Sequence, residues 1–479
     1  MKILFAASEM TPFARTGGLG DVAAALPVAL TELGHEVTCC LPFYRCAREA
    51  AREARPAGLS FRVPVGSKLL GAEILELKTA DGVRVLFVQR DEFFDRSELY
   101  HTGVRDYEDN AERFIFFSKA VAELLEHERY RPDVLHCHDW QTALAPAELL
   151  YRNRTRGGAY GVKTVFTIHN LAYQGLFPGT DFPLTNLPGE FFAPAALEFY
   201  GQLNLLKGGL VFADAITTVS PSYAREIQTP EGGCGLEPVL RSRRGDLRGI
   251  LNGADYRQWN PAIDPLLDRN YSARDLAGKR VCRAELLRRF RLEADETTPV
   301  AAFISRLTEQ KGVELLLESM DDLLRLGLAL LVLGKGERRY EEQLQERAGE
   351  HPRQVAAQIG YGGELSHQML GGADALLMPS RFEPCGLTQM YALKYGTVPV
   401  VHATGGLADT VAEYDAPSGR GHGFRFAPYT RQAFVGAVER AVSVCQQPKQ
   451  WKQIVENAMA CDFSWRAAAV KYEKLYAAL

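Results

Sequence analysis

The sequence has no long hydrophobic run, no paired-cysteine motif and no strong excess of charge of one sign. The longest apolar runs, such as Leu326–Leu333, are far shorter than the ~20 residues of a membrane-spanning helix. The opening run Met1–Ser8 is too short for a signal peptide. Nine cysteines without a CxxC pair predict reduced thiols in a cytoplasmic chain. The formal net charge of −4 gives no electrostatic reason to expect nucleic-acid binding.

Several signatures of catalytic chemistry are also missing. The chain contains no GxSxG, no HExxH and no Walker loop, so the motifs of three large hydrolase classes are absent. The glycine-rich loop after the first apolar run is not GxGxxG, and only Glu36 stands near the place of the expected acidic residue. A nicotinamide dinucleotide is therefore not the expected ligand.

What the sequence does have is a regular alternation of short apolar runs and amphipathic segments. This alternation, in a chain of 479 residues with 46% hydrophobic and 24% charged residues, predicts an α/β protein of two or three domains. The strands expected are Ile3–Ala7, Glu36–Leu41, Val83–Val88, Val134–Cys137, Thr164–Ile168, Ala215–Val219, Val300–Ile304, Leu328–Leu333, Ala375–Met378 and Val398–Val401. Val313–Leu324 and Gln432–Cys445 show helical spacing.

The segment from about 245 to 292 is poorer in apolar periodicity and richer in Arg, Asp, Asn and Pro. We therefore expect one domain over 1–248 and a second over 249–460. Each is expected to be an open, doubly wound sheet, in which ligands bind at the carboxyl ends of the strands.

A glycine-rich loop, Arg15–Asp21, follows the first expected strand and precedes a helix. Its glycines allow a ligand to approach the backbone, the helix start offers free N–H groups, and Arg15 adds a charge suited to phosphate. Thr404–Asp409 matches Thr16–Asp21 at five of six positions, which favours two phosphate- or sugar-facing turns in related halves. The alternatives are ordinary tight turns and a chance similarity.

The second half has three charged candidates at the ends of expected strands. Arg306 and Lys311 lie between a strand and a helix, where two cations could neutralise a departing diphosphate without a metal; otherwise they are solvated loop charges. Glu383 could accept hydrogen bonds from sugar hydroxyls, unless it is a capping or surface carboxylate. The helix start at Gly386–Thr388 could offer N–H groups to a phosphate.

Histidines end two strands of the first half. His136, His138 and Asp139 invite a metal interpretation, but the two histidines stand at strand period, so structural histidines beside a sugar-contacting Asp139 are favoured. His169 follows the next strand and could position a substrate hydroxyl. Without its neighbours, a satisfied core histidine would be the default interpretation.

Together these motifs resemble the bacterial glycogen synthases and the catalytic part of plant starch synthases, which are retaining glucosyltransferases of GT-B fold. The resemblance spans the whole chain. Its motifs, in chain order, are Arg15–Leu19, His138–Trp140, Thr167–Gly175, Leu251–Asp255, Ser305–Gly312, Ser380–Gln389 and Thr404–Thr410.

The resemblance implies two Rossmann-like domains facing a deep cleft, with 461–479 packing back on the first. It implies catalytic roles for Glu383, Arg306, Lys311, His169 and Asp139. It further implies a donor site made of Arg15, Gly18, Asp21, Asn252, Tyr361, Cys385, Gly386, Leu387, Thr388, Thr404, Gly405 and Gly406. Within this set Asn252 would lie near the hinge and the glucose, and Tyr361 near the nucleotide base.

The implied reaction moves glucose from ADP-glucose to the 4-hydroxyl of a glycogen or maltooligosaccharide acceptor, with retention and without a metal or cofactor. Arg15 stands where many members have Lys. Tyr391 stands where related transferases have a second Glu, and the glycogen synthase branch commonly lacks that Glu. UDP-glucose as the donor, or a small acceptor, remains open. A non-catalytic glucan- or nucleotide-sugar-binding protein is a further alternative, and a metal hydrolase a distant one.

Overall fold

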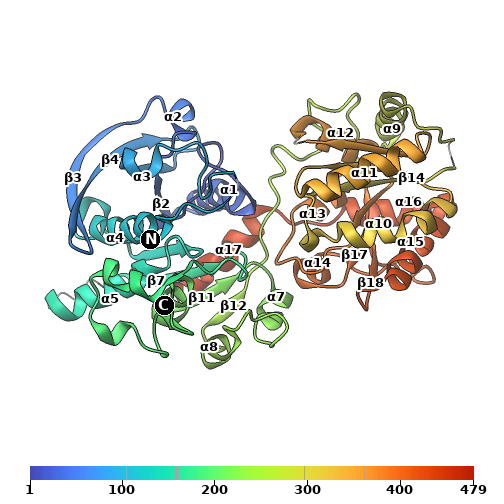
Figure 1. Ribbon diagram of the computed structural model, residues 1–479. Helices are drawn as coiled ribbons and strands as arrows, with labels where there is room; N and C mark the ends of the chain where they lie inside the picture. Colours follow the sequence, from blue (N-terminus) through green and yellow to red (C-terminus); the bar gives the residue numbers. More distant parts are fainter. Residues whose placement is uncertain (104, 157–160, 296, 361) are drawn as a thin grey trace. The chain divides into compact units, whose positions relative to one another are not determined.

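The computed structural model describes residues 1–103, 105–156, 161–295, 297–360 and 362–479. The chain forms two compact units, one of Met1–Gly253 with Trp465–Leu479 and one of Ala254–Ser464 (Figure 1). The divisions fall a few residues after the boundaries at 248 and 460 that we expected. In the described ranges, no helix combines the length and the apolar character that a membrane crossing requires.

The first unit is built on a nine-stranded sheet with the order β12-β11-β7-β6-β1-β2-β5-β4-β3. Its parallel strands are β1 (Lys2–Ala6), β2 (Glu36–Pro42), β5 (Arg84–Gln89), β6 (Val134–His138), β7 (Lys163–Ile168), β11 (Ala215–Thr218) and β12 (Leu247–Gly249). All six strands that the sequence predicted in this unit are present, with ends shifted by one residue at most. The short strand β12 was missed.

An antiparallel hairpin, which the sequence interpretation missed, extends this sheet at one edge. Strand β3 (Arg55–Val65) pairs with β4 (Lys68–Lys78), and β4 pairs antiparallel with β5. The exposure of β3 alternates residue by residue, as expected for a strand with one solvated face. Only Val63 and Val65 of β3 are fully buried, so a search for continuous apolar runs could not find this hairpin.

Helices α1 (Gly18–Glu32) and α17 (Trp465–Ala477) pack together over β1 and β2. In Figure 1 the red helix α17 lies among the blue and green elements of the first unit. Trp465, Tyr472 and Tyr476 fill the core cluster formed with α1. The last segment of the chain is therefore part of the first unit's core.

The remaining helices of the first unit are short, apart from the longer α4, α5 and α6. They are α2 (Ala47–Ala50), α3 (Asp91–Phe94), α4 (Asn110–Leu124), η1 (Glu128–Tyr130), α5 (Leu144–Arg156), η2 (Gly179–Thr185), η3 (Gly189–Phe191), α6 (Leu205–Phe212), α7 (Pro221–Glu226) and α8 (Glu237–Ser242). A separate small sheet joins β8 (Leu176–Pro178), β10 (Gln202–Asn204) and β9 (Glu198–Phe199).

The second unit has a six-stranded, fully parallel sheet in the order β15-β14-β13-β16-β17-β18. The strands are β13 (Val300–Ile304), β14 (Ala329–Gly334), β15 (Val355–Ile359), β16 (Ala375–Met378), β17 (Val398–His402) and β18 (Phe424–Phe426). Numbered within the unit, the order is 3-2-1-4-5-6, the Rossmann arrangement. The sequence predicted four of these strands and missed the edge strands β15 and β18.

Helices cover both faces of this second sheet. Their bounds are α9 (Ala277–Phe290), η4 (Glu309–Lys311), α10 (Val313–Arg325), α11 (Arg338–Glu350), α12 (Gly363–Gly372), α13 (Thr388–Lys394), α14 (Gly405–Thr410), α15 (Arg431–Cys445) and α16 (Pro448–Met459). Phe303 and Val332 belong to the core with α10 and α15, whereas Ala302 and Leu331 belong to the core with α9 and α12. Strands buried on both faces read as continuous apolar runs, which is why the sequence revealed them.

Both sheets have a switch point at which the strand order reverses direction. In the first unit, β1 lies between β2 and β6. In the second, β13 lies between β14 and β16. Loops at the carboxyl ends of two such neighbouring strands diverge and leave room for a ligand. The candidate residues follow these strands.

Candidate active site

In the second unit, a lysine and a glutamate meet at the switch point. Lys311 ends η4 after β13, and Glu383 follows β16. The Lys311 Nζ donates to Glu383 Oε2 at 2.5 Å, and Ser380 Oγ donates to the same oxygen at 3.1 Å. Glu383 is buried, with 5% of its surface exposed. The structure therefore brings together two of the residues that the sequence singled out 72 positions apart.

The turn after Lys311 fits only a glycine. Gly312 has φ +73°, and a Cβ placed on it would lie 1.8 Å from the carbonyl oxygen of Pro379. The loop after β13 thus packs directly on the loop after β16. Arg381 N donates to Gln310 O across the same contact at 2.9 Å. This packing holds the Lys311 backbone against the loop that carries Glu383.

A second glycine turn closes on Glu383 from the other side. Gly405 has φ +44°, and a Cβ there would lie 2.0 Å from the Glu383 carbonyl oxygen. Gly406 N donates to that oxygen at 3.0 Å. Thr404 is buried beside them, at the start of α14. The predicted turn at 404–406 therefore packs on the backbone of Glu383.

The loop from Cys385 to Thr388 is held by a residue that the sequence interpretation missed. Gln389 Nε2 donates to Cys385 O at 2.9 Å and to Gly386 O at 3.0 Å. Leu387 precedes α13 and is partly exposed. Because Gln389 is fully buried and also contacts Thr410 Oγ1, it ties this loop to α14.

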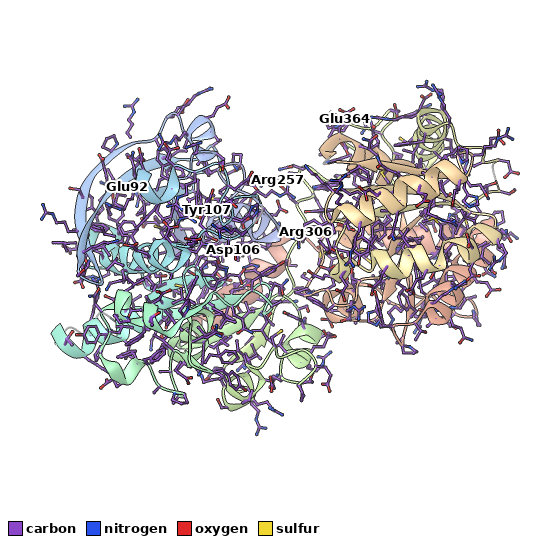
Figure 2. All side chains as sticks on the ribbon, in the orientation of Figure 1. Glu92, Asp106, Tyr107, Arg257, Arg306 and Glu364 are labelled. Atoms are coloured by element: carbon purple, nitrogen blue, oxygen red, sulfur yellow. The ribbon has the colours of Figure 1, made fainter. Side chains whose placement is uncertain are left out.

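Arg306 is an exposed cation in the loop directly after β13 (Figure 2). Within the described ranges its guanidinium forms no hydrogen bond or ion pair. Lys311, by contrast, already contacts Glu383. Among the described residues, therefore, Arg306 is unpaired and Lys311 is paired at the same strand end. Tyr361, the residue expected near a nucleotide base, lies outside the described residues.

In the first unit, a buried carboxylate organises the glycine-rich loop after β1. Glu9 is 4% exposed and accepts hydrogen bonds from Thr16 N and Thr16 Oγ1, both at 2.6 Å, and from Gly17 N at 3.2 Å. Tyr100 OH donates to the same carboxylate at 2.9 Å. The sequence interpretation overlooked Glu9, although its place directly after a strand, in front of the glycines, was a usable signal.

Helix α1 begins at Gly18, inside the range Arg15–Asp21 that was expected to precede it. Arg15 does not stand free, since its guanidinium contacts Asp21 at 3.0 Å. The Arg15 side chain is 59% exposed, so this ion pair is weak. Burial raises the pKa of Asp21, and the charge of Arg15 opposes that rise.

Residues 16–21 and 404–409 are similar in sequence, but the two segments do not follow equivalent strands of the two sheets. The first loop follows β1, the first strand of its sheet, whereas the second follows β17, the fifth of its own. Gly17 has φ −159°, unlike Gly405, and a Cβ at Gly18 would meet nothing within 4 Å. The similarity therefore does not support the expected relationship between the halves.

Asp139 and His169 meet at the ends of β6 and β7. Asp139 has φ +54°, an unusual conformation for a residue other than glycine, and its Oδ1 accepts a hydrogen bond from His169 N at 2.8 Å. Burial raises the pKa of Asp139 to about 7, against the lowering effect of the backbone N–H groups. Strained backbone beside a perturbed carboxylate is typical of functional sites.

The histidines of β6 are partnered with other side chains. His136 Nε2 contacts Thr167 Oγ1 at 2.6 Å, and its Nδ1 contacts Tyr476 OH at 2.8 Å. His138 Nδ1 contacts His169 Nε2 at 2.9 Å. Burial lowers the pKa of both His136 and His169 to about 3. Among the described residues, no group of three or more His, Cys, Asp or Glu side chains could hold a metal ion.

Asn252 lies near the end of the first unit's main segment. It is 7% exposed, and its side-chain oxygen Oδ1 is buried without a hydrogen-bond partner among the described residues. An unsatisfied buried oxygen is uncommon and needs an explanation. A ligand that donates a hydrogen bond to Asn252 would supply one.

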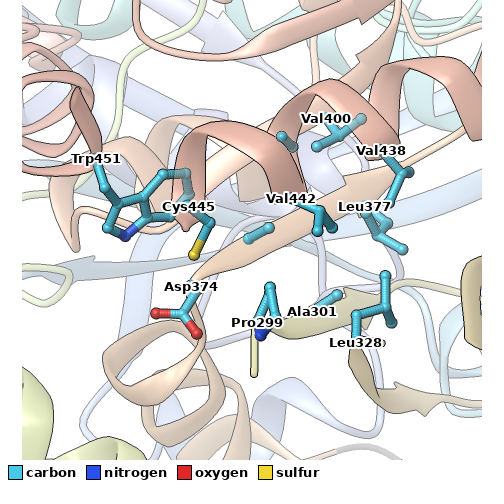
Figure 3. Close-up of a pocket in the computed structure, with 12 residues that line it drawn as sticks. Pro299, Ala301, Leu328, Asp374, Leu377, Val400, Val438, Val442, Cys445 and Trp451 are labelled. Atoms are coloured by element: carbon cyan, nitrogen blue, oxygen red, sulfur yellow. The ribbon is translucent and has the colours of Figure 1, made fainter. Parts of the chain in front are cut away.

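A small apolar cavity in the second unit lies away from these residues. Pro299, Leu328 and Asp374 line it just before β13, β14 and β16 begin. Cys445 of α15 and Trp451 of α16 complete it (Figure 3). It therefore sits at the amino ends of the strands, opposite Lys311 and Glu383. Its apolar lining marks it as a gap in the core.

Two Rossmann-like units with polar residues at their switch points define the GT-B class of glycosyltransferases. Residues 2–242 match the starch synthase catalytic domain family, and 286–458 match the glycosyl transferases group 1 family. The chain belongs to the starch and glycogen synthase family, and it is a glycosyltransferase. The fold and the family that the sequence indicated are thereby confirmed.

Relatives match over the full length. The chain is 46% identical to a glycogen synthase of Opitutus terrae, over 99% of each chain. It is 48% identical to a glycogen synthase of Anaeromyxobacter dehalogenans strain 2CP-C, over 100% of each. Among solved structures, the catalytic domain of starch synthase IV from Arabidopsis thaliana, bound to ADP and acarbose, aligns with TM-score 0.90 and 35% identity. That alignment covers 100% of this chain and 98% of the other. Sucrose-phosphate synthase from Thermosynechococcus elongatus, at 16% identity and TM-score 0.61, shares the fold.

Proposed function

We propose that this chain transfers glucose from ADP-glucose to the non-reducing 4-hydroxyl end of an α-1,4-glucan, with retention of configuration and without a metal. The observation that carries the proposal is the contact of Lys311 Nζ with Glu383 Oε2 at the switch point of the second sheet. The full-length similarity to glycogen synthases supports the acceptor, and the ADP-bound starch synthase supports the nucleotide.

In this proposal the second unit holds the donor. Arg306 and Lys311 bind the diphosphate and stabilise the charge that develops as it leaves, which is the work of a preorganised cationic site. Glu383 accepts hydrogen bonds from the glucose hydroxyls. The 385–388 loop and the turn at 404–406 bind the rest of the donor.

The first unit supplies polar contacts to the sugars. Asp139 and His169 contact hydroxyl groups of glucose, and Asn252 Oδ1 accepts a hydrogen bond from the ligand. Arg15, Gly18 and Asp21 contact the donor at the start of α1. Glu9 has no direct contact in this account, and holds the loop in the shape that these residues need.

The transfer needs no nucleophile from the protein, because the bonds that break and form balance without one. The bond between glucose C1 and the β-phosphate oxygen breaks while the acceptor 4-oxygen bonds to C1 on the same face. The acceptor's hydroxyl proton passes to the departing phosphate oxygen. Exclusion of water prevents hydrolysis of the donor. No step uses a metal, because Arg306 and Lys311 supply the positive charge.

We further propose a cytoplasmic location. All nine cysteines, each of which lies in the described ranges, are free thiols. Free buried thiols are expected in a reducing compartment.

The test is nucleoside-diphosphate release by the purified protein with ADP-glucose or UDP-glucose, with and without glycogen, in the presence of EDTA. Glycogen-dependent release of ADP is the expected result. Preference for UDP-glucose would overturn the proposed nucleotide alone. Binding of a donor without transfer to glycogen would contradict the acceptor, and loss of activity in EDTA would contradict the metal-free reaction.

A further inference from the structure

Three histidine rings lie side by side in the first unit, two on β6 and one directly after β7, and neighbouring rings are tilted against one another. His138 is fully buried, with its ring 3.9 Å from that of Phe5 and 4.1 Å from that of His136, measured between centroids. His136 has partners at both ring nitrogens. Within the part of the chain that the structure describes, His138 has a partner only at Nδ1, which contacts His169 Nε2 at 2.9 Å. The His138 Nε2 atom is buried without a partner among the described residues.

Both members of the His138–His169 pair are neutral near pH 7. Burial lowers the pKa of each ring, for His169 to about 3, and the neighbouring histidines lower that of His138 further. A neutral imidazole carries one N–H, so one nitrogen donates and the other accepts. The contact between Nδ1 and Nε2 therefore needs a proton on one of these two atoms.

The unpartnered atom decides between the two arrangements. If His169 donated from Nε2, His138 would accept at Nδ1 and carry its proton on Nε2, leaving a buried N–H without an acceptor. Orphaned buried N–H groups are rarer than under-satisfied acceptors. If His138 donates from Nδ1, only a lone pair is left unmatched. His169 then accepts at Nε2 and keeps its own proton on Nδ1.

We propose that His138 is a positioning residue that fixes His169 as the Nδ1–H tautomer, so that His169 offers its substrate a hydrogen-bond donor. The role toward substrate rests on the proposed function. His169 is partly exposed, and Asp139 Oδ1 already holds its backbone N–H. The ring is therefore fixed in both orientation and protonation, and a ligand oxygen beside Nδ1 must act as an acceptor.

The direct test is nitrogen NMR of the full-length protein labelled with ¹⁵N-histidine, without substrate. Two-bond proton–nitrogen correlations separate the protonated from the bare ring nitrogen, and His169→Asn assigns the His169 signals. We expect the proton on Nδ1 of His169. A proton on Nε2 of His169 would overturn the proposal.

Two variants connect the tautomer to turnover. In His138→Asn, the side-chain amide keeps an N–H donor near the position of Nδ1, and His169 should keep its tautomer and most of its activity. His138→Leu removes the Nδ1–H donor to His169. His169 should then populate both tautomers, and kcat should fall about tenfold. The matched control is Tyr476→Phe, which removes a hydrogen bond to His136 and leaves the pair intact.

The outcomes separate this inference from the proposed function. Equal kcat in His138→Leu and His138→Asn, with the His169 signals unchanged in both, would contradict the positioning role. Wild-type protein with the Nδ1–H tautomer but no glucosyl transfer would contradict the proposed function and leave the tautomer assignment standing.

Discussion

At the scale of single residues, the second unit's site depends on one contact between opposite charges. Lys311 and Glu383 are mostly buried, with side chains 17% and 7% exposed. Lys311 ends the short helix η4, and Glu383 lies in the loop after β16. Beside each of them is a glycine, Gly312 or Gly405, that cannot be replaced without a clash. Sequence reasoning identified both residues, because charged side chains directly after apolar strands are informative. It did not identify their contact.

Replacing either residue should impair the chemical step. Lys311→Ala removes a charge that would stabilise the leaving diphosphate, and kcat should fall at least ~10²-fold. Glu383→Gln keeps the shape but loses the charge, and a similar loss is expected. Steady-state ADP release measures both. The control is Lys452→Ala, which removes an exposed lysine of α16. Near-normal kcat in Lys311→Ala would contradict the role given to this lysine.

His136 should make the first unit sensitive to acid. Its folded-state pKa is about 3, against about 6.5 in the unfolded chain. As pH falls below about 6.5, the unfolded state takes up a proton that the folded state refuses, so stability is lost. Through His136, the free energy of unfolding is about 2 kcal/mol lower at pH 5 than at pH 7. Asp139, whose pKa is raised to about 7, acts in the opposite direction over this range.

A comparison with His136→Gln isolates the contribution of His136 to the pH dependence of stability, because Asp139 is present in both proteins. The variant should have a lower free energy of unfolding than wild type at pH 7. Between pH 7 and pH 5, however, its free energy of unfolding should fall by about 2 kcal/mol less than that of wild type. Calorimetric unfolding at the two pH values measures the difference. Parallel pH profiles for variant and wild type would show that His136 does not titrate as inferred.

At the scale of elements, buried strands were predictable and edge strands were not. β13 and β14 are covered by helices on both faces, so they appear as continuous apolar runs. β3 alternates between exposed and buried residues, and β18 has only three residues, so neither gives such a run. The supporting residues Glu9 and Gln389 were missed for a different reason. Glu9 holds its own loop through Thr16 and Gly17, and Gln389 ties the 385–388 loop to α14, so both act through hydrogen bonds that leave no apolar pattern in the sequence.

The turn at Gly405 offers a test of how far loop packing controls the site. Gly405→Ala would place a methyl group 2.0 Å from the Glu383 carbonyl oxygen at a positive φ. The Glu383 loop must then move, and a shift of about 1 Å can cost ~10²-fold in kcat/KM. Steady-state kinetics at a temperature well below Tm, measured beforehand, gives the answer.

Gly436→Ala is the matched control. Gly436 lies within α15, and a Cβ there meets nothing within 4 Å, so alanine should stabilise the protein by up to about 1 kcal/mol and leave kcat/KM unchanged. Wild-type kcat/KM in Gly405→Ala would show that the Glu383 backbone is not held by this turn.

At the scale of the whole molecule, the chain leaves its first unit and returns to complete it. The sequence resemblance implied this return, and α17 supplies Tyr472, fully buried, to the first unit's core. Tyr472→Ala should therefore destabilise the first unit by about 3–5 kcal/mol. Limited proteolysis with mapping of the cleavage sites should show earlier cutting within 1–253 than within 254–464.

Lys471→Ala is the control for this change, since Lys471 is the exposed neighbour on the same helix. It should be as resistant to protease as wild type. Earlier cutting of 254–464 in Tyr472→Ala would mean that α17 supports the other unit as well.

The central claim is the retaining transfer of glucose to a glucan. The most direct measurement is NMR of a reaction containing ADP-glucose labelled with ¹³C in the glucose, a maltooligosaccharide and EDTA. We predict a new α-1,4-linked anomeric signal that grows in step with one ADP released per glucose added. A β-linked product, or labelled free glucose with no elongated chain, would contradict the account.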